Sequence, residues 1–304
     1  MQWITADIPE LQGKLFVVTG ANAGIGLAIV TALAAKHAQV VLACRDPTKG
    51  QAARSRILSN DNDARIDVEE LDLASLESVR AFAQRMHSRH RAIDGLINNA
   101  GVAIPPLGRT QEGFETQFGV NVLGHFALVG QLLPLLSEAP AGRIVSMSSL
   151  AHWIGRIDFA NLNAERAYSK TSAYYQSKLA NLIFAYELQR RLALNGSRVA
   201  SMAAHPGVCR SDLFRHSRTL AVLFQSIAQP IEMGALPPLM AATSPSIRGG
   251  DYVGPGNCFT VRGYPTVQRS SRQSHDLELG ARLWNTAEAL IRLRYLTETG
   301  RAEC

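Results

Sequence analysis

The chain has 304 residues, of which 46% are hydrophobic and 18% are charged. This balance is typical of a globular domain and supplies enough apolar material for a sizeable core. The net charge of +6 is scattered, and the densest basic cluster, at 85–91, falls at the predicted end of a helix. Cations are favoured there by the helix dipole, so a nucleic-acid interface is not expected.

The cysteine content and the N-terminal segment exclude further classes of protein. Four widely spaced cysteines form no paired motif, so the sequence predicts neither a disulfide framework nor a metal site, and a cytoplasmic location is expected. No basic region followed by an apolar run begins the chain, and no stretch of about 18 uninterrupted apolar residues occurs. The sequence therefore predicts neither a signal peptide nor a membrane span, and leaves peripheral membrane contact open.

Short apolar, β-branched runs alternate along the chain with segments of helical periodicity. The predicted strands are 15–19, 39–43, 66–71, 93–97, 143–147 and 198–203, with a last one around Phe259. The predicted helices are 24–36, 47–59, 75–90, 111–137 (broken near Gly124 or Pro134), 171–194 and 278–295. Most of the strands lack a polar face, which indicates a parallel sheet covered by helices on both sides.

A glycine-rich turn at 19–26 joins the first predicted strand to the first helix. Glycines allow such a turn and let backbone N–H groups approach a pyrophosphate at the helix N-terminus. A tight turn without a ligand is the alternative, but the place of the motif in the first βα unit favours a dinucleotide. The spacing is Gly-x-x-x-Gly-x-Gly, at Gly20, Gly24 and Gly26.

The end of the second predicted strand bears on the choice of dinucleotide. An acidic residue there would bind the ribose 2′-hydroxyl of NAD, whereas an arginine suits the 2′-phosphate of NADP. Arg45 stands at this position and predicts NADP(H). Two alternatives stay open: Asp46 could reach the ribose, and Arg45 could be a plain surface residue.

The predicted fold follows from this pattern. It is α/β, a three-layer, Rossmann-type, doubly wound parallel sheet in a single domain over residues 1–304. The nucleotide-binding half spans about 14–148, and the catalytic and substrate-binding half spans about 149–304.

Tyr174 and Lys178 are four residues apart within the predicted helix at 171–194. On a helix this spacing puts both side chains on one face. An ammonium near a phenol favours the phenolate, and a tyrosine tuned in this way can exchange a proton with a reacting oxygen. The spacing alone also fits a solvated pair, so its meaning depends on the rest of the chain.

Taken together, these motifs resemble those of the short-chain dehydrogenase/reductase family over nearly the whole chain. Within the family the chain looks most like the retinol-dehydrogenase-like and protochlorophyllide-reductase-like branch. The segments that carry the resemblance are 19–26, 43–46, 72–73, 98–101, Asn121, 148–152, 174–181, 205–208 and 250–265.

The resemblance implies a role for each matching residue. Ser149 would hydrogen-bond the substrate oxygen and Tyr174 would transfer the proton, while Lys178 would lower the pKa of the tyrosine and hold the nicotinamide ribose. Asn121 would occupy a proton-relay and structural position. The residues that would contact the cofactor are Gly20, Asn22, Gly24, Ile25, Gly26, Arg45, Asp72, Leu73, Asn99, Ala100, Gly101, Tyr174, Lys178, Pro206, Gly207, Val208 and Ser211.

The implied activity is that of an NADP(H)-dependent oxidoreductase, which transfers hydride between nicotinamide and an alcohol or carbonyl. Two other hypotheses stay open. One is reduction of a conjugated C=C bond, as in the protochlorophyllide reductases. The other is an NADP-binding regulatory or scaffold protein without catalysis, which the presence of Ser149, Tyr174, Lys178 and Asn121 disfavours.

The substrate is predicted to be a small, hydrophobic molecule. The apolar segment at 210–233 favours such a substrate, although the same residues could simply pack on the core. We expect contacts from Leu150, His152, Trp153 and Phe214, with a structural loop role as the alternative for His152 and Trp153. Homodimers or higher homo-oligomers are implied by the resemblance, through the helices at 111–137 and 171–194.

Overall fold

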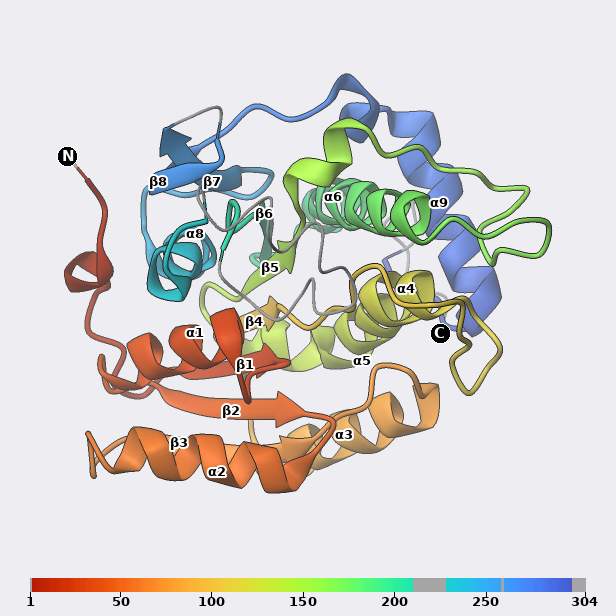
Figure 1. Cartoon of the computed structure of the whole chain (residues 1–304). Helices are drawn as coiled ribbons and strands as arrows, with labels where there is room; N and C mark the ends of the chain where they lie inside the picture. Colours follow the sequence, from red (N-terminus) through yellow and green to blue (C-terminus); the bar gives the residue numbers. More distant parts are fainter. Residues whose placement is uncertain (1, 210–227, 258–259, 297–304) are drawn as a thin grey trace.

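The computed structural model describes residues 2–209, 228–257 and 260–296. Its centre is one eight-stranded sheet in the order β3-β2-β1-β4-β5-β6-β7-β8, parallel throughout except for the antiparallel pair β7 and β8. Strand β3 lies at one end of the molecule and β8 at the other (Figure 1). The strands are β1 Leu15–Thr19, β2 Gln39–Cys44, β3 Arg65–Glu70, β4 Gly95–Asn98, β5 Arg143–Met147, β6 Ala200–Ala204, β7 Tyr252–Asn257 and β8 Arg262–Val267.

Helices cover both faces of this sheet and make it the middle of three layers. Helices α1, α2 and α8 pack on one face, and α3, α5, α6 and α9 pack on the other. The structure therefore confirms the predicted three-layer, Rossmann-type fold in a single domain. The helices are α1 Gly24–Ala34, α2 Pro47–Leu58, α3 Leu76–Arg89, α4 Thr116–Phe118, α5 Gly124–Glu138, α6 Lys170–Leu194, α8 Ile231–Thr243 and α9 Leu277–Ile291.

The central strands are apolar throughout because each contributes to two cores. In β1, Leu15 and Val17 face the core under α5 and α6, while Phe16 and Val18 face the core under α1 and α8. Successive side chains of a strand point to opposite faces, so a strand covered on both sides has no polar face. This is the property from which the sequence predicted the parallel sheet.

The predicted helix at 111–137 differs from the structure at its start and at its break. The helix begins at Thr116, because the carboxylate of Glu115 accepts hydrogen bonds from the N–H groups of Gln117 and Phe118 and thus caps it. The break is a π turn at Gly119–Leu123, directly before Gly124. Pro134, the other predicted break, lies inside α5.

The sequence predicted one last strand, and this number is wrong. Two antiparallel strands, β7 and β8, stand on either side of the position expected for one. Phe259, the predicted centre, lies outside the described residues. The chain reverses direction between β7 and β8, and Gly263 within β8 has a φ of +116°.

Helix α9 packs against α6 and α5 through an aromatic cluster. The ring of Trp284 lies 4.8 Å from that of Phe126 on α5 and 5.9 Å from that of Phe184 on α6. Tyr295 joins the cluster and donates a hydrogen bond to the carbonyl of Phe126. Parts of both helices that the sequence offered for self-association are thus covered by the chain itself.

The segment Thr116–Glu138 is long and apolar enough to cross a membrane by length and composition alone. Most of its apolar window, 72%, is buried inside the protein. The core helix of a globular protein has the same character, and the packing of α5 in the core accounts for its apolar residues.

Candidate active site

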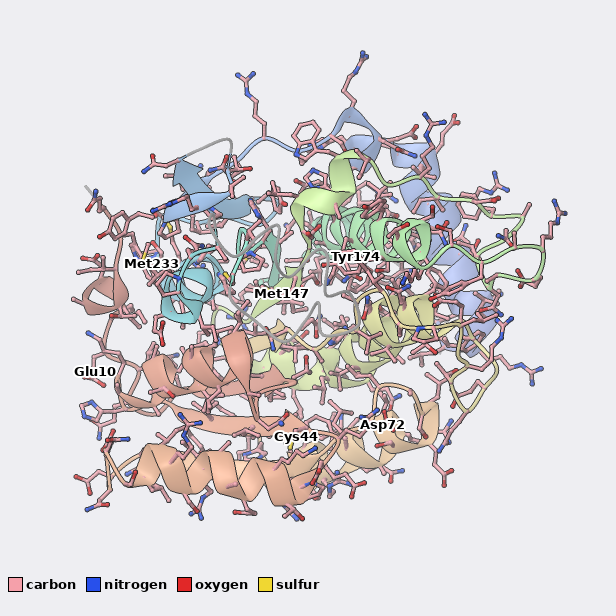
Figure 2. The ribbon with its side chains drawn as sticks, in the orientation of Figure 1. Glu10, Cys44, Asp72, Met147, Tyr174 and Met233 are labelled. Atoms are coloured by element: carbon pink, nitrogen blue, oxygen red, sulfur yellow. The ribbon has the colours of Figure 1, made fainter. Side chains whose placement is uncertain are left out.

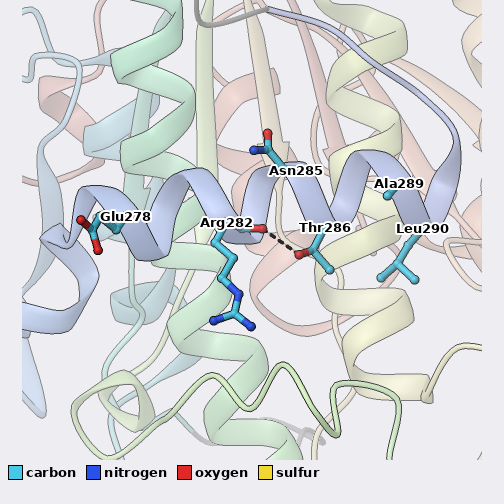
Figure 3. Close-up of a pocket in the computed structure, with 6 residues that line it drawn as sticks. All are labelled: Glu278, Arg282, Asn285, Thr286, Ala289 and Leu290. Carbon is cyan, nitrogen blue, oxygen red and sulfur yellow. Dashed lines mark hydrogen bonds between the residues drawn. The ribbon is translucent and has the colours of Figure 1, made fainter.

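The predicted site residues gather at the carboxyl edge of the sheet, where the parallel strands end. Cys44 ends β2, Asp72 follows β3 and Met147 ends β5, and Tyr174 lies on α6 beyond them (Figure 2). In open α/β sheets this edge is the usual place for a ligand. A separate pocket on the outer face of α9, lined by Glu278, Arg282, Asn285, Thr286, Ala289 and Leu290, contains none of the predicted site residues (Figure 3).

The glycine turn is held by backbone contacts that leave no room for side chains. A Cβ on Gly20 would stand 2.8 Å from the Cα of Ala100, and a Cβ on Gly26 would stand 2.5 Å from the carbonyl oxygen of Gly20. The amide of Asn99 donates to the carbonyl of Thr19 at 2.8 Å. Asn99 therefore holds the turn in shape from the neighbouring strand.

The N-terminus of α1 fits the phosphates of a dinucleotide. Its cap residue, Ala23, offers no side-chain acceptor to the N–H groups of the first turn. Gly24 has a φ of +56°, and a Cβ there would meet nothing within 4 Å, so the turn is open on that side. Exposed N–H groups together with the helix dipole make such an end an anion site.

At the end of β2 the structure separates the two residues that the sequence left ambiguous. The carboxylate of Asp46 accepts a hydrogen bond from the N–H of Lys49 and caps α2. This hydrogen bond is the main reason that the pKa of Asp46 is lowered. Arg45 is exposed at the same edge of the sheet. Asp46 is thus engaged in the fold, while the guanidinium of Arg45 is the group presented to solvent.

Two further predicted cofactor residues follow β3. The carboxylate of Asp72 accepts a hydrogen bond from the N–H of Ala74 at 2.9 Å and shapes the turn into α3. Leu73 is buried in the core between the sheet, α3 and α5. Both residues stand next to the nucleotide edge, with Asp72 half-buried.

Ser149, Tyr174 and Lys178 come together as predicted. Ser149 follows β5, and Tyr174 and Lys178 lie one turn apart on α6. Burial raises the pKa of Tyr174 to about 12, and the nearby hydroxyl of Ser149 opposes this shift and lowers the pKa in part. Tyr174 is only 4% exposed.

The sequence predicted that Lys178 lowers the pKa of Tyr174, and the structure corrects this prediction. The ammonium nitrogen lies 5.8 Å from the centre of the tyrosine ring and donates to the carbonyl of Met147. Burial lowers the pKa of Lys178 to about 8. The sequence supplied the spacing but not the desolvation, which is the main cause of the pKa shifts of both groups.

The adjacent serines and tyrosines have different surroundings. Ser148 is buried and donates to the carbonyl of Lys178 at 2.8 Å, so its hydroxyl serves the packing of α6 on the sheet. Tyr175 packs edge-on against Tyr174, with ring centres 6.3 Å apart. Of the two serines and the two tyrosines, the residues chosen from the sequence, Ser149 and Tyr174, interact with each other.

Asn121 is fully buried on the π turn, and both the oxygen and the nitrogen of its side-chain amide form hydrogen bonds. Its oxygen accepts from the N–H of Val102, and its nitrogen donates to the carbonyl of Val102 and to the hydroxyl of Ser177. A Cβ on Gly101 would stand 3.2 Å from the Asn121 oxygen and 3.7 Å from the nitrogen of Lys178. Asn121 thus fixes the segment after β4 beside the lysine.

Beyond β6, Gly207 has a φ of +68° and the N–H of Val208 donates to the carbonyl of Val261. Pro206 accepts a hydrogen bond from the side-chain amide of Gln229. These contacts place the predicted Pro-Gly-Val segment at the carboxyl edge. Ser211 and Phe214 lie outside the described residues.

The predicted substrate residues divide into two groups. Trp153 is 53% exposed beside the site, and Leu150 is half-buried. His152 is 1% exposed, and its ring nitrogens face the carbonyl of Ser149 and the N–H of Ser271. Both ring nitrogens of His152 therefore have hydrogen-bond partners within the protein. This favours the structural loop role over the predicted substrate contact.

Sequence reasoning missed His125, which lies buried on α5 between the glycine turn and Asn121. Its only signal in the sequence is a polar residue near the start of a largely apolar helix. Sequence reasoning also missed His205 and Tyr252, whose rings pack together behind Ser149 and next to His152. No group of three or more metal-ligating side chains occurs among the residues that the structure describes.

This fold and this set of residues define a dinucleotide-dependent oxidoreductase. Residues 14–220 match the short chain dehydrogenase family, and the chain belongs to the short-chain dehydrogenase/reductase family. Human retinol dehydrogenase 12 is 40% identical over 291 residues, which cover 94% of this chain and 89% of that protein.

Solved structures show the same architecture. A crystal structure of an uncharacterized protein from Mycobacterium paratuberculosis shares 40% sequence identity and covers 96% of this chain and 98% of its own, with a TM-score of 0.81. A short chain dehydrogenase from Shigella flexneri, complexed with NADP, has a TM-score of 0.63 and 23% identity, and covers 81% of this chain and 98% of its own. The second likeness shows the fold alone.

Replacement of Gly26 by alanine tests the close packing of the glycine turn. Because the added Cβ would press on the carbonyl oxygen of Gly20, we expect Gly26→Ala to lower the free energy of unfolding by about 1–3 kcal/mol. Urea unfolding measures this loss. Gly280→Ala on α9 is the matched control, since its Cβ would make an ordinary 3.4 Å contact with the carboxylate of Glu187 on α6. Equal effects in the two variants would contradict the account.

Replacement of Lys178 by methionine tests the burial of the ammonium. Since the pKa of Lys178 is about 8 in the folded protein and 10.5 ordinarily, the unfolded chain binds more protons between these values. The free energy of unfolding of the wild type should therefore rise relative to Lys178→Met as the pH increases from about 8 to about 10.5, by ~3 kcal/mol in total.

Urea unfolding of both proteins across this range measures that difference. Lys170→Met, which removes an exposed ammonium from the start of the same helix, is the control. A wild-type stability that falls relative to Lys178→Met, or a change of the same size in the control, would show that the burial of Lys178 is not the cause.

Proposed function

We propose that this protein is an NADP(H)-dependent oxidoreductase that transfers hydride between nicotinamide and an alcohol or carbonyl of a hydrophobic substrate. The observation that carries the proposal is the grouping of Ser149, whose hydroxyl lowers the pKa of Tyr174, with buried Tyr174 and with Lys178 one helical turn further on. Two hydroxyl groups on adjacent elements can meet one substrate oxygen. The buried lysine beside them supplies positive charge.

In this proposal the bound nicotinamide supplies or accepts the hydride, and the protein handles the oxygen and its proton. Burial holds the proton on Tyr174 at neutral pH, because it raises the pKa of the phenol to about 12. In the direction of reduction, the phenol donates this proton to the substrate oxygen as negative charge develops on it. The Ser149 hydroxyl donates a hydrogen bond to the same oxygen and stabilises that charge.

The ammonium of Lys178 has the complementary task. When Tyr174 has given up its proton, the positive charge 5.8 Å from its ring centre favours the tyrosinate that remains. A ribose hydroxyl of the cofactor is a further partner for the ammonium in this proposal. The segment 101–102, which Asn121 fixes beside the lysine, would line the same part of the cofactor.

NADP(H) is favoured over NAD(H) by the end of β2. Asp46 is used as the cap of α2, and Arg45 is exposed where a 2′-phosphate would lie. A guanidinium binds a phosphate through paired, charge-assisted hydrogen bonds. The NADP complex of the short chain dehydrogenase from Shigella flexneri agrees with this choice at the level of the shared fold.

A hydrophobic substrate is favoured by the surroundings of Tyr174. Ala103 and Ile104 form a small apolar cluster with Tyr174, and Ala151 and Tyr175 pack against it. Trp153 and Ile154 follow on the same turn and are 53% and 64% exposed. Exposed apolar side chains beside a site commonly mark a binding surface. The similarity to an enzyme named for retinol, an apolar alcohol, supports the same class of substrate.

The cytoplasmic location and self-association remain part of the proposal. Reduced cysteines agree with the first, since Cys44 and Cys209 are buried and unpaired. For the second, Trp284 and Tyr295 already cover parts of α5 and α6, so a homodimer would use other parts of these helices.

Replacement of Tyr174 by phenylalanine tests the assignment of the proton donor. We expect kcat with an apolar aldehyde to fall by ~100-fold or more, because the general acid is lost, while NADPH still binds. Steady-state NADPH oxidation measures kcat, and fluorescence titration measures binding. Tyr175→Phe is the matched control, since it removes a hydroxyl from the adjacent ring, and it should retain turnover.

Normal turnover by Tyr174→Phe would contradict the assignment of Tyr174 as the proton donor. Failure of the wild type to oxidise NADPH with any aldehyde, ketone or enone would favour a protein that binds NADP without catalysis.

Replacement of Arg45 by alanine tests the choice of cofactor. We expect KM for NADPH to rise by ~10-fold or more, because a charge-assisted contact with the 2′-phosphate is lost, while KM for NADH changes little. Steady-state kinetics with both cofactors measure the two constants. Arg56→Ala removes an exposed arginine from the far end of α2 and should leave both constants unchanged. A wild type that prefers NADH would remove the role proposed for Arg45.

A further inference from the structure

His125 is a buried polar residue that the proposed chemistry does not use. It lies on α5, 3% exposed, and each ring nitrogen has one partner. One nitrogen, Nε2, lies 2.9 Å from the hydroxyl oxygen of Thr19, and the other, Nδ1, lies 3.1 Å from the carbonyl oxygen of Asn121. The histidine thus bridges the strand that ends in the glycine turn and the π turn that carries Asn121.

The chemistry of these partners fixes the tautomer of the ring. A backbone carbonyl can only accept, so Nδ1 of His125 carries the proton and donates to Asn121. Nε2 is then the acceptor, and the Thr19 hydroxyl donates to it. Burial lowers the pKa of His125 to about 4, so the ring stays neutral at physiological pH and keeps this pattern. A neutral ring with one donor and one acceptor satisfies both partners.

On the cofactor side, the contact extends through Thr19. Its hydroxyl oxygen accepts from the N–H of Ala100 at 2.9 Å, and its carbonyl accepts from the amide of Asn99 at 2.8 Å. A Cβ on Gly20, the next residue, would already touch Ala100. The hydroxyl of Thr19 therefore connects His125 to the two segments that form the glycine turn.

On the catalytic side, the contact extends through Asn121. The Asn121 amide donates to the hydroxyl of Ser177 at 3.0 Å, and Ser177 donates to the carbonyl of Tyr174 at 2.8 Å. Because His125 faces the backbone carbonyl of Asn121 and Ser177 faces its side chain, the contacts from the end of β1 to the backbone of Tyr174 are linked through the residue Asn121 itself. In this set His125 joins the glycine turn to Asn121, and the side chain of Asn121 then crosses to Ser177 on α6.

We propose that His125 is a positioning residue that keeps the glycine turn and the Tyr174 helix in register, through Thr19 on one side and Asn121 on the other. The inference rests on the proposed function, because it concerns the same site. It adds a residue that contacts neither cofactor nor substrate. A purely structural histidine would contribute to stability alone, whereas this one affects cofactor binding and turnover through separate nitrogens.

Three substitutions separate the two contacts. His125→Asn retains an N–H donor near Asn121 but is too short to reach Thr19. His125→Gln can present its oxygen to Thr19 but loses the donor to Asn121. His125→Phe keeps a ring of similar size and loses both contacts. For each variant, fluorescence titration gives the Kd of NADPH, steady-state kinetics give kcat, and urea unfolding gives stability.

The proposal predicts that His125→Asn and His125→Gln affect different quantities. Loss of a hydrogen bond between buried groups costs roughly tenfold in the affected step, so His125→Asn should raise Kd by ~10-fold and His125→Gln should lower kcat by ~10-fold, each with little change in the other quantity. His125→Phe should change both, and Thr19→Val, which also removes the acceptor of the Ala100 N–H, should raise Kd at least as much as His125→Asn. Changes in Kd and kcat that move together in proportion to stability, or no change at all, would overturn the proposal.

A second measurement does not depend on activity. Histidine ring nitrogens labelled with ¹⁵N report the tautomer by NMR in the protein alone, and the His125 signals are those missing from His125→Asn. We expect a neutral ring with the proton on Nδ1, and a shift of the Nε2 signal in Thr19→Val. A proton on Nε2 would overturn the proposal whether or not the enzyme turns over. The predicted tautomer in a wild type that oxidises no NADPH would instead indicate failure of the proposed function.

Discussion

The rest of the site depends on the close approach of two backbone segments at the carboxyl ends of β1 and β4. Glycine at position 20 allows the first segment to touch Ala100, and Asn99 and the Thr19 hydroxyl hold the two together. This contact opens the N-terminus of α1 toward the ligand edge. It also places the segment after β4 beside Lys178, so a single packing constraint orients both the phosphate site and the catalytic face of α6.

Burial controls the electrostatics of this face. Desolvation disfavours charge on either group, so it raises the pKa of Tyr174 to about 12 and lowers that of Lys178 to about 8. The site thus holds a protonated phenol and a readily discharged ammonium within a few ångströms, which suits proton transfer to a developing alkoxide.

Much of the fold could be predicted because it depends on local patterns. The runs Leu15–Thr19 and Arg143–Met147 are short, apolar and bounded by polar or glycine residues, and their predicted bounds agree with the structure. The start of the helix near Thr116 could not be predicted, because it depends on how the Glu115 side chain folds back on the backbone. Ser149, Tyr174 and Lys178 were predictable from spacing and resemblance, whereas the surroundings of His152 depend on Ser271 and Tyr252, about a hundred residues away in the sequence.

The central claim is that hydride reaches a carbonyl carbon while Tyr174 protonates the oxygen. Its most direct test is reduction of an apolar enal, which offers both a C=O and a C=C bond, with NADPH that carries deuterium at the transferred position. Mass spectrometry and NMR of the product then locate the label. The account predicts one deuterium on the carbon that bears the new hydroxyl group, with the hydroxyl proton drawn from solvent. Deuterium on the β-carbon of a saturated aldehyde would contradict it and would indicate reduction of the conjugated C=C bond.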